Sequence, residues 1–440
     1  MSDDVKQEGL TGKTVVLGVQ HMFVMFGATV LVPLLTGLDV GVTLFAAGVG
    51  TWLFHILTKF KVPVFLGSSF AFLPPLFVIG ASEGLPYALG GIVIAGAVYV
   101  VVAIIFNFVS IDILHRILPP YVTGPVIILI GVILAPVAIL NSVDGYVGNV
   151  QAQVGVLGCW GIAGFTFAAG ILVKVAFPKW RMKFLSLLPV LVAIIAGYVL
   201  SIIVGIVDFT VVKEAAWFGV PKFTAPKFSW TAISFVVPIA IVTIVEHFGD
   251  IIAIGNVVGK DFLKDPKISR TLLGDGLATM LSAAIGGPAN TTYSENTGAV
   301  ALTGVYNPWV MRIAAIVAII IAFIPKFTSV VLTIPAPVIG GISILLFGMI
   351  AAIGIKNMVD AKVDMGNPKV LIIVAAMMVL GLGTGTIGQL TNAFGGINPD
   401  ASFATGSAIN FGNFSFGGLG LAAIVGILLN LIINFKKKDA

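Results

Sequence analysis

GPANTTYSENTGAVALTG, residues 287–304, is the stretch of sequence that decides how this chain folds. It places an unbroken polar run, residues 290–297 with Glu295 inside it, between strongly apolar segments. A helix that faces lipid does not carry such a run, and backbone groups left unpaired in hydrocarbon cost several kcal/mol. We therefore expect a broken membrane segment that is buried in protein or lines a cavity.

The composition around this stretch is that of a membrane protein. Of 440 residues, 58% are hydrophobic and 10% are charged, and the mean hydropathy is +1.11. Soluble domains are about 25% charged, so a soluble enzyme, a nucleic-acid-binding protein and a disordered scaffold are excluded. The surroundings we expect are a lipid bilayer, with no nucleic acid as partner. Cys159 is the only cysteine, which excludes an intrachain disulfide and a thiol-ligated metal site, and no metal or other cofactor is expected.

Apolar stretches long enough to cross a bilayer recur along the whole chain. A membrane-spanning helix needs about 20 apolar residues, and we count about fourteen candidates. They are approximately 14–36, 41–57, 63–80, 87–109, 121–140, 155–177, 184–207, 231–258, 271–287, 288–303, 309–325, 327–354, 369–388 and 417–435. The fold class predicted is an all-α polytopic membrane protein. The third candidate, PVFLGSSFAFLPPLFVIG, is broken by glycine, serine and proline in the same way as the tenth.

The basic residues predict how these spans are oriented. With a cytoplasmic N-terminus and fourteen alternating spans, most lysines and arginines lie on the cytoplasmic side, as the positive-inside rule requires. The lysines left on the outer side are Lys213, Lys222, Lys227 and Lys326. The N-terminal sequence MSDDVKQEGLTGK is polar and predicts no removable signal peptide. We expect a cell-membrane protein with both termini in the cytoplasm.

Two halves of the chain resemble each other. The broken spans are the third of the first seven and the third of the second seven, and 119–134 matches 335–350 in its proline, valine, glycine and Ile-Leu positions. Seven is odd, so the second copy enters the membrane from the opposite side, which is the inverted-repeat plan of secondary transporters. The repeats predicted are 1–207 and 231–440, joined by an outer loop at 208–230.

Three acidic residues lie well inside apolar segments: Glu246, Asp250 and Glu295. Intramembrane carboxylates are costly and usually mark ion or substrate pathways. Glu246 and Asp250 are spaced i, i+4, so they share one helix face, and two close, poorly solvated carboxylates favour the protonated form of one of them. They are candidate proton carriers. The alternative is a buried polar pair that only holds helices together.

Other polar residues in the spans favour structural roles. Asp275 is nearer a span end and is interpreted as a partner or cap near the cytoplasmic interface. His247 points about 100° away from Glu246 on a helix, which favours packing or an interhelical hydrogen bond. His21 fits a polar contact between helices or a group that supports the site.

The polar run suits a small, flat, neutral, polar ligand. Backbone N–H groups of a broken segment and the start of the following half-helix can bond carbonyl groups of a ligand, and an acid accepts from its N–H groups. Across the repeat, Phe70 and Phe72 offer rings for stacking. The alternative is that these rings are ordinary core side chains.

Taken together, these motifs resemble the nucleobase-ascorbate transporter family, also called nucleobase:cation symporters, and most closely its bacterial uracil-transporting members. The resemblance runs nearly end to end. It rests on QHMFVMFGATVLVP (20–33), FLGSSFAF (65–72), the Glu-His pair at 246–247, NTTYSENTG (290–298) and the pattern Glu295-Asn296-Thr297-Gly298 followed by Thr303.

This resemblance implies a 7+7 inverted repeat with a core domain of spans 1–4 and 8–11 and a gate domain of spans 5–7 and 12–14. Short antiparallel strands in spans 3 and 10 would meet near the membrane centre. It also implies a homodimer through the gate domain. The residues it assigns to substrate binding are Glu246, Glu295, Phe70, Tyr293 and Ser294, to proton coupling Glu246, Asp250 and Glu295, and to support His21, Ser69 and Asn296.

The function expected is proton-coupled uracil symport into the cell. Glu295 is typical of the uracil type, whereas the xanthine and urate types have Gln. Asp250 departs from uracil permeases that have His there, and Ser294 from those that have Gly. The alternatives are transport of a purine base such as xanthine, or anion exchange by the related 7+7 fold. An intramembrane hydrolase is disfavoured because its nucleophile and metal motifs are missing from the sequence.

Overall fold

The computed structural model describes residues 11–108, 113, 116–144, 150–180, 182, 185–384, 409–411, 414–416 and 418–434. Its helices are α1 (Gly12–Thr36), α2 (Val40–Leu57), η1 (Phe70–Phe72), α3 (Leu73–Ser82), α4 (Leu85–Ile105), α6 (Pro120–Ser142), α7 (Val150–Val175), η2 (Leu185–Leu187), α8 (Pro189–Val204), α9 (Thr210–Glu214), α10 (Trp230–Val258), η3 (Leu263–Lys267), α11 (Ile268–Ala284), α12 (Ser294–Thr303), α13 (Trp309–Ala322), α14 (Pro325–Leu332), α15 (Ala336–Asp360), α16 (Pro368–Gly383) and α19 (Gly418–Asn434). The strands are β1 (Leu66–Ser68), β2 (Asn290–Thr292), β3 (Ile409–Phe411) and β4 (Phe414–Phe416).

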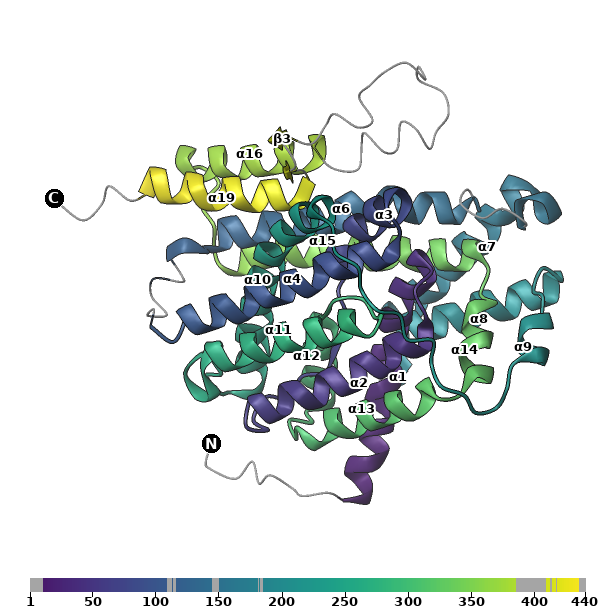
Figure 1. Cartoon of the computed structure of the whole chain (residues 1–440). Coiled ribbons are helices and arrows are strands. Elements are labelled where there is room, and N and C mark those ends of the chain that lie inside the picture. The colour runs from purple at the N-terminus through teal and green to yellow at the C-terminus, as the bar shows by residue number, and fades with distance from the viewer. Residues whose placement is uncertain are drawn as a thin grey trace, which may run out of the picture.

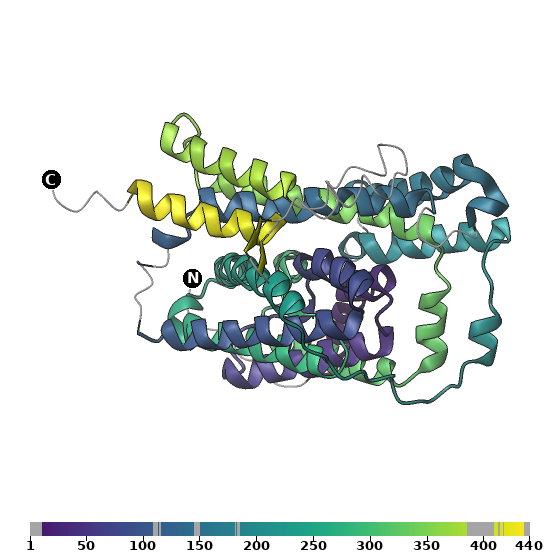
Figure 2. The same ribbon diagram turned by 45° about the horizontal axis from the view of Figure 1, so that its top comes forward.

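The helices form two groups that lie against each other (Figure 1). In the first helix group α1, α2, α4, α10, α11 and α13 pack on one another, with α3 and α12 added to them. In the second helix group α6, α7, α8, α15, α16 and α19 do the same. Figure 2 shows the second group as a layer above the purple α1 and α2. Each group draws helices from both halves of the sequence.

Length and hydropathy identify the helices that suit a membrane. Among the described residues, 7 helices are long and apolar enough to span one. A further pair, Trp309–Ala322 with Pro325–Leu332, is bent by 87° at its break, and the shorter apolar helices are Phe70–Ser82, Pro189–Val204, Pro368–Gly383 and Gly418–Asn434. The predicted stretches 271–287 and 288–303 correspond to α11 and to β2 with α12. The boundary predicted at 327 was wrong, because α14 ends at Leu332 and α15 begins only after Pro335.

The two broken spans meet as the expected antiparallel strand pair. Leu66 pairs with Thr292, Gly67 with Thr291 and Ser68 with Asn290. Strand β1 continues into η1 and α3, and β2 continues through Tyr293 into α12. Each strand therefore supplies the partner for the backbone of the other, which meets the requirement for broken structure at membrane depth.

Neighbouring helices hold both strands in place. Asn290 Nδ2 donates to Ala46 O at 2.9 Å, and Asn290 O accepts from Thr279 Oγ1 at 2.8 Å. Before β1, Val64 O lies 2.9 Å from Nε2 of His55. Because these partners come from α2 and α11, the strand pair is a fixed part of the first helix group.

Candidate functional site

The strand pair, α10 and the second helix group enclose a small buried cavity of about 30 Å³. It is lined by Ser69, Phe70, Ile127, Glu246, Thr291, Thr292, Tyr293, Ile350 and Ile353. All polar members come from the first helix group, whereas the three isoleucines come from α6 and α15 of the second. The cavity thus has one polar wall and one aliphatic wall, and it lies between the two groups.

Four of the predicted residues meet at this cavity: Glu246, Phe70, Tyr293 and Ser69. The Oγ atom of Ser69 is buried and has no hydrogen-bond partner among the described residues, while its backbone N–H donates to Ala289 O at 2.9 Å. A buried hydroxyl without a partner is costly. Ser69 therefore offers a polar group that a ligand in the cavity can bind.

Tyr293 lines the cavity and also connects the two strands by a hydrogen bond. Its hydroxyl donates to Ser68 O at 2.9 Å, and Ser68 Oγ donates in turn to Thr29 O at 3.0 Å. The ring lies over Gly67, where an added Cβ would come within 2.5 Å of Tyr293 Cε2. A glycine at 67 is therefore what lets the tyrosine cross from one strand to the other.

Asp250 lies beside the cavity but does not line it. It is 5% exposed, and its Oδ2 accepts a hydrogen bond from Thr292 Oγ1 at 2.9 Å. Thr292 lines the cavity from β2. The two carboxylates of the i, i+4 pair on α10 therefore have different positions. Glu246 faces the cavity directly, and Asp250 is connected to it through the hydroxyl of Thr292.

Behind Thr292 lies a buried His–Asp pair. Asp275 is 0% exposed, and its Oδ2 is 3.2 Å from Nδ1 of His247, so of its two expected roles it has that of a partner and not that of an exposed cap. His247 makes the interhelical contacts expected of it: Nε2 is 3.0 Å from Thr271 Oγ1, and Nδ1 is 3.4 Å from Thr292 Oγ1.

Hydrogen bonds orient the His247 ring. Thr271 Oγ1 donates to Ile268 O at 3.0 Å, so it accepts from His247 Nε2. Nδ1 then faces the Asp275 carboxyl group at ion-pair distance, and neither carboxyl oxygen of Asp275 has a hydrogen-bond partner among the described residues.

The remaining predicted residues are placed as follows. Asn296 is buried in α12, and its Nδ2 donates to Pro63 O at 3.0 Å, which ties this helix to the segment before β1. His21 is buried in α1, and neither ring nitrogen has a hydrogen-bond partner among the described residues. Ser294 and Glu295 open α12 directly after Tyr293. The side chains of both lie outside the described part of the structure, so their roles stay predictions.

Sequence reasoning missed the aliphatic wall made by Ile127, Ile350 and Ile353. Two of these residues fall within the matched segments 119–134 and 335–350, so the repeat itself was the available signal. Isoleucine is ordinary in a membrane helix, and only the pairing of the two segments distinguishes these positions.

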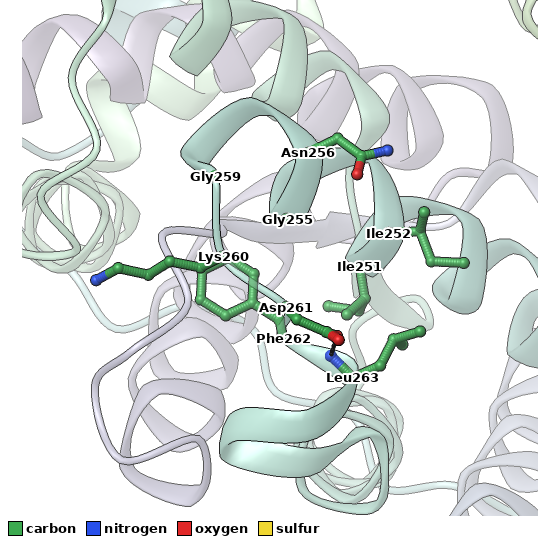
Figure 3. Close-up of a pocket in the computed structure, with 9 residues that line it drawn as sticks. All are labelled: Ile251, Ile252, Gly255, Asn256, Gly259, Lys260, Asp261, Phe262 and Leu263. Atoms are coloured by element: carbon green, nitrogen blue, oxygen red, sulfur yellow. Dashed lines mark hydrogen bonds between the residues drawn. The ribbon is translucent and has the colours of Figure 1, made fainter. Parts of the chain in front are cut away.

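A second cavity, of about 450 Å³, lies where α10 ends and the chain turns toward α11 (Figure 3). Asp261 accepts from the N–H of Leu263 at 3.1 Å. Its pKa is held below the usual range, chiefly by the hydrogen bond and charge of Lys264, 3.0 Å away. The Lys260 side chain points away from Asn256 and Leu263. This cavity contains none of the predicted site residues.

Metal binding finds no support in the ranges that the structure describes. No group of three or more His, Cys, Asp or Glu side chains there is arranged to hold an ion. The polar wall next to Glu246 instead combines one carboxylate, hydroxyls and strand backbone, which suits hydrogen bonding to an uncharged ligand.

Comparison with known proteins identifies relatives over nearly the whole chain. A model of the Permease family matches residues 12–389. The uracil permease of Bacillus caldolyticus is 39% identical over 443 residues, covering 99% of this chain and 96% of that protein. The uracil permease of Bacillus subtilis strain 168 is 38% identical over 427 residues, covering 96% of this chain and 92% of that protein.

Solved structures show the same fold at low identity. The transmembrane domain of a cyanobacterium bicarbonate transporter, BicA, aligns with a TM-score of 0.63 and 16% identity, covering 87% of this chain and 96% of that one. The structure of SLC26A9 aligns with a TM-score of 0.68 and 11% identity, covering 97% of this chain and 66% of that one. These likenesses confirm the predicted fold class, a 7+7 inverted repeat of membrane helices. The family resemblance of the motifs is confirmed by the relatives, and the chain belongs to the Permease family.

Proposed function

We propose that this permease is a secondary active transporter that carries uracil into the cell together with a proton. The observation that supports the proposal best is the two-sided cavity, whose polar wall holds Glu246 and the unpaired hydroxyl of Ser69. Uracil has a polar edge of alternating N–H and C=O groups and an apolar C5–C6 edge. Proteins named uracil permeases are similar to this chain along its whole length.

The two edges of the base fit the two walls. The Glu246 carboxylate accepts from one ring N–H group, Ser69 and the strand backbone near Phe70 and Ser294 bond a carbonyl, and the Phe70 ring stacks on the base. Glu295, which opens α12, is proposed to serve the other N–H group. The C5–C6 edge then faces the isoleucines of α6 and α15.

Movement of the two helix groups gives the base its access. The cavity is small, about 30 Å³, and it lies between the two helix groups. The aliphatic wall is therefore proposed to move away from the polar wall to admit the base. The first helix group acts in this scheme as the core domain and the second as the gate domain, alternating between an outward and an inward arrangement, with a homodimer formed through the gate.

Proton coupling is proposed to use the polar groups behind the cavity. Glu246 meets the base. Hydrogen bonds connect Asp250, Thr292 and His247 next to it, and Asp275 lies 3.2 Å from the His247 ring. Uracil is neutral near pH 7, so symport with one proton moves one positive charge inward. That charge contributes about 2.3 kcal/mol per 100 mV of membrane potential, with both termini placed in the cytoplasm of a cell-membrane protein.

An anion exchanger is the second candidate, because one structural neighbour is a bicarbonate transporter. The wall chemistry disfavours it, since the Glu246 carboxylate lines the cavity and repels an anion unless it is protonated. A purine base such as xanthine remains the alternative within the same chemistry.

Uptake into proteoliposomes separates these functions. The purified chain is reconstituted, a pH gradient that is acidic outside is imposed, and labelled uracil is followed with xanthine, guanine, adenine or bicarbonate as competitor. We expect uracil to accumulate and a protonophore to abolish the accumulation. Accumulation that persists with the protonophore present would contradict proton coupling, and stronger competition by xanthine than by unlabelled uracil would contradict the substrate.

A further inference from the structure

A third cavity, of about 600 Å³, lies between the two helix groups and shares no residue with the cavity at Glu246. It is lined by Lys13, Leu17, Gln20, Lys174, Pro178, Ser186, Leu187, Leu302, Thr303 and Val305. The first helix group contributes α1 and the end of α12, and the second contributes the end of α7 and η2. Its volume falls within the range of about 300–1,000 Å³ for small-molecule sites.

The charged side chains that line this cavity are all positive. Lys13 and Lys174 both line it, and no acidic side chain does. Neither lysine forms an ion pair with any residue that the structure describes. Two ammonium groups without a carboxylate partner favour an anionic occupant.

Five other lining residues are apolar, Leu17, Pro178, Leu187, Leu302 and Val305, and three are uncharged and polar, Gln20, Ser186 and Thr303. Lys13, Leu17 and Gln20 follow one face of α1, with the lysine in the first turn. Lys174 lies in the last turn of α7. The cations therefore lie at helix ends on the predicted cytoplasmic side. Leu17 lies one turn after Lys13 on α1, while Leu302 comes from α12 and Leu187 from η2. A soluble anion needs no such apolar wall.

We propose that this cavity binds one anionic phospholipid of the inner leaflet. Its phosphate lies between Lys13 and Lys174, and the first part of an acyl chain lies against Leu17, Leu187 and Leu302. Basic pockets between membrane helices on the cytoplasmic side are the sites that bind anionic head groups. A zwitterionic lipid binds less well, because the two lysines repel its ammonium group. The lipid touches both helix groups at once and is independent of which base the permease carries.

Native mass spectrometry of the purified full-length protein tests the proposal. The protein is titrated with phosphatidylglycerol and, separately, with phosphatidylcholine of the same acyl chains. We expect one phosphatidylglycerol to bind preferentially. K13Q/K174Q is expected to weaken that binding about 25-fold, because each basic residue near an anionic surface contributes roughly fivefold. The matched control is K356Q/K369Q, which removes two exposed lysines from the ends of other helices and should leave binding unchanged.

A second variant tests the apolar wall, and a soluble probe separates a lipid from a free phosphate. Leu302 is 66% exposed, so L302Q leaves the packing intact and is expected to weaken phosphatidylglycerol binding several-fold. Glycerol 3-phosphate, which carries the head-group phosphate without acyl chains, should give no protection against thermal unfolding where phosphatidylglycerol does. Equal binding of both lipids, equal loss in both lysine pairs, or full protection by glycerol 3-phosphate would each overturn the proposal.

Discussion

The ring of Phe70 meets the ring of Phe347 edge-on, with centroids 6.0 Å apart and planes inclined by 77°. Phe70 belongs to η1 beside β1, and Phe347 to α15 of the second helix group. This contact joins the two groups at the edge of the cavity that holds Glu246. A movement that opens the cavity has to part the two rings.

Removing either ring is expected to have different effects on binding and on transport. Phe70→Ala loses both the ring pair, worth about 0.5–1.5 kcal/mol, and the proposed stacking surface, so uracil binding should weaken about tenfold or more. Phe347 is 1% exposed, so Phe347→Leu is used because it keeps most of the buried volume; it loses the ring pair and should change uptake rate more than affinity. Isothermal titration and uptake on both variants check this, and equal losses of affinity would contradict a stacking role for Phe70.

Glu246→Gln is expected to abolish uracil uptake. The substitution keeps the size of the side chain but replaces a carboxylate that accepts from N–H groups with an amide that also donates. Membrane insertion and thermal stability should match the wild type, because Glu246 is only partly buried. Wild-type uptake by this variant would remove Glu246 from the proposed site. Glu295→Ala is expected to behave in the same way.

Asp250→Asn is expected to change proton coupling more than binding. The amide oxygen still accepts from Thr292 Oγ1, so the local packing should survive, but the group no longer exchanges a proton. Uracil uptake measured against external pH should therefore flatten while affinity at one pH stays within about threefold of wild type. An unchanged pH profile would exclude Asp250 as a proton carrier.

The close contact between His247 and Asp275 predicts a contrast between two substitutions. Asp275→Asn keeps a polar group of the same size beside His247 Nδ1 and should leave thermal stability nearly unchanged. Asp275→Ala leaves a buried ring nitrogen without its neighbour and should lower the free energy of unfolding by about 1–3 kcal/mol. Thermal unfolding in detergent measures both variants, and an equal loss in Asp275→Asn would contradict the prediction.

Gly67→Ala is expected to damage the strand crossing. Its Cβ would lie 2.5 Å from the Tyr293 ring, and overpacking of this kind costs about 1–3 kcal/mol, so both thermal stability and uracil binding should fall. Gly249→Ala is the control, because a Cβ there meets no atom within 4 Å. Equal behaviour of the two variants would show that the close approach of Tyr293 to residue 67 is not required.

The sequence predicted the elements of the fold better than the pairing of its polar side chains. Hydropathy and the polar run at 290–297 were enough to predict the spans and the broken segments, because a helix in lipid must have a certain length and apolar side chains. The strand pair itself came from the family resemblance. Pro335 decides where α15 begins, and an apolar run that continues past a proline hides that boundary.

Asp275 shows why the identity of side-chain partners escaped prediction. Its position near a span end suggested a partner or a cap, and only the structure shows that the partner is His247 on another helix. Contacts between helices depend on how each helix is rotated about its own axis. Mean hydropathy along the sequence gives no information on that rotation. The isoleucines at the cavity escaped for the same reason, since their type is common and only their facing direction is informative.

The pairing of β1 with β2 also has a consequence for the order of synthesis. The ribosome makes β1 in the first half of the chain and β2 only in the second, so β1 enters the membrane before its partner exists. Until residues 290–292 arrive, its backbone groups need another partner, because lipid supplies none. We expect the first half, made alone, to be retained by the insertion machinery or degraded, so a single repeat is not a stable product of translation.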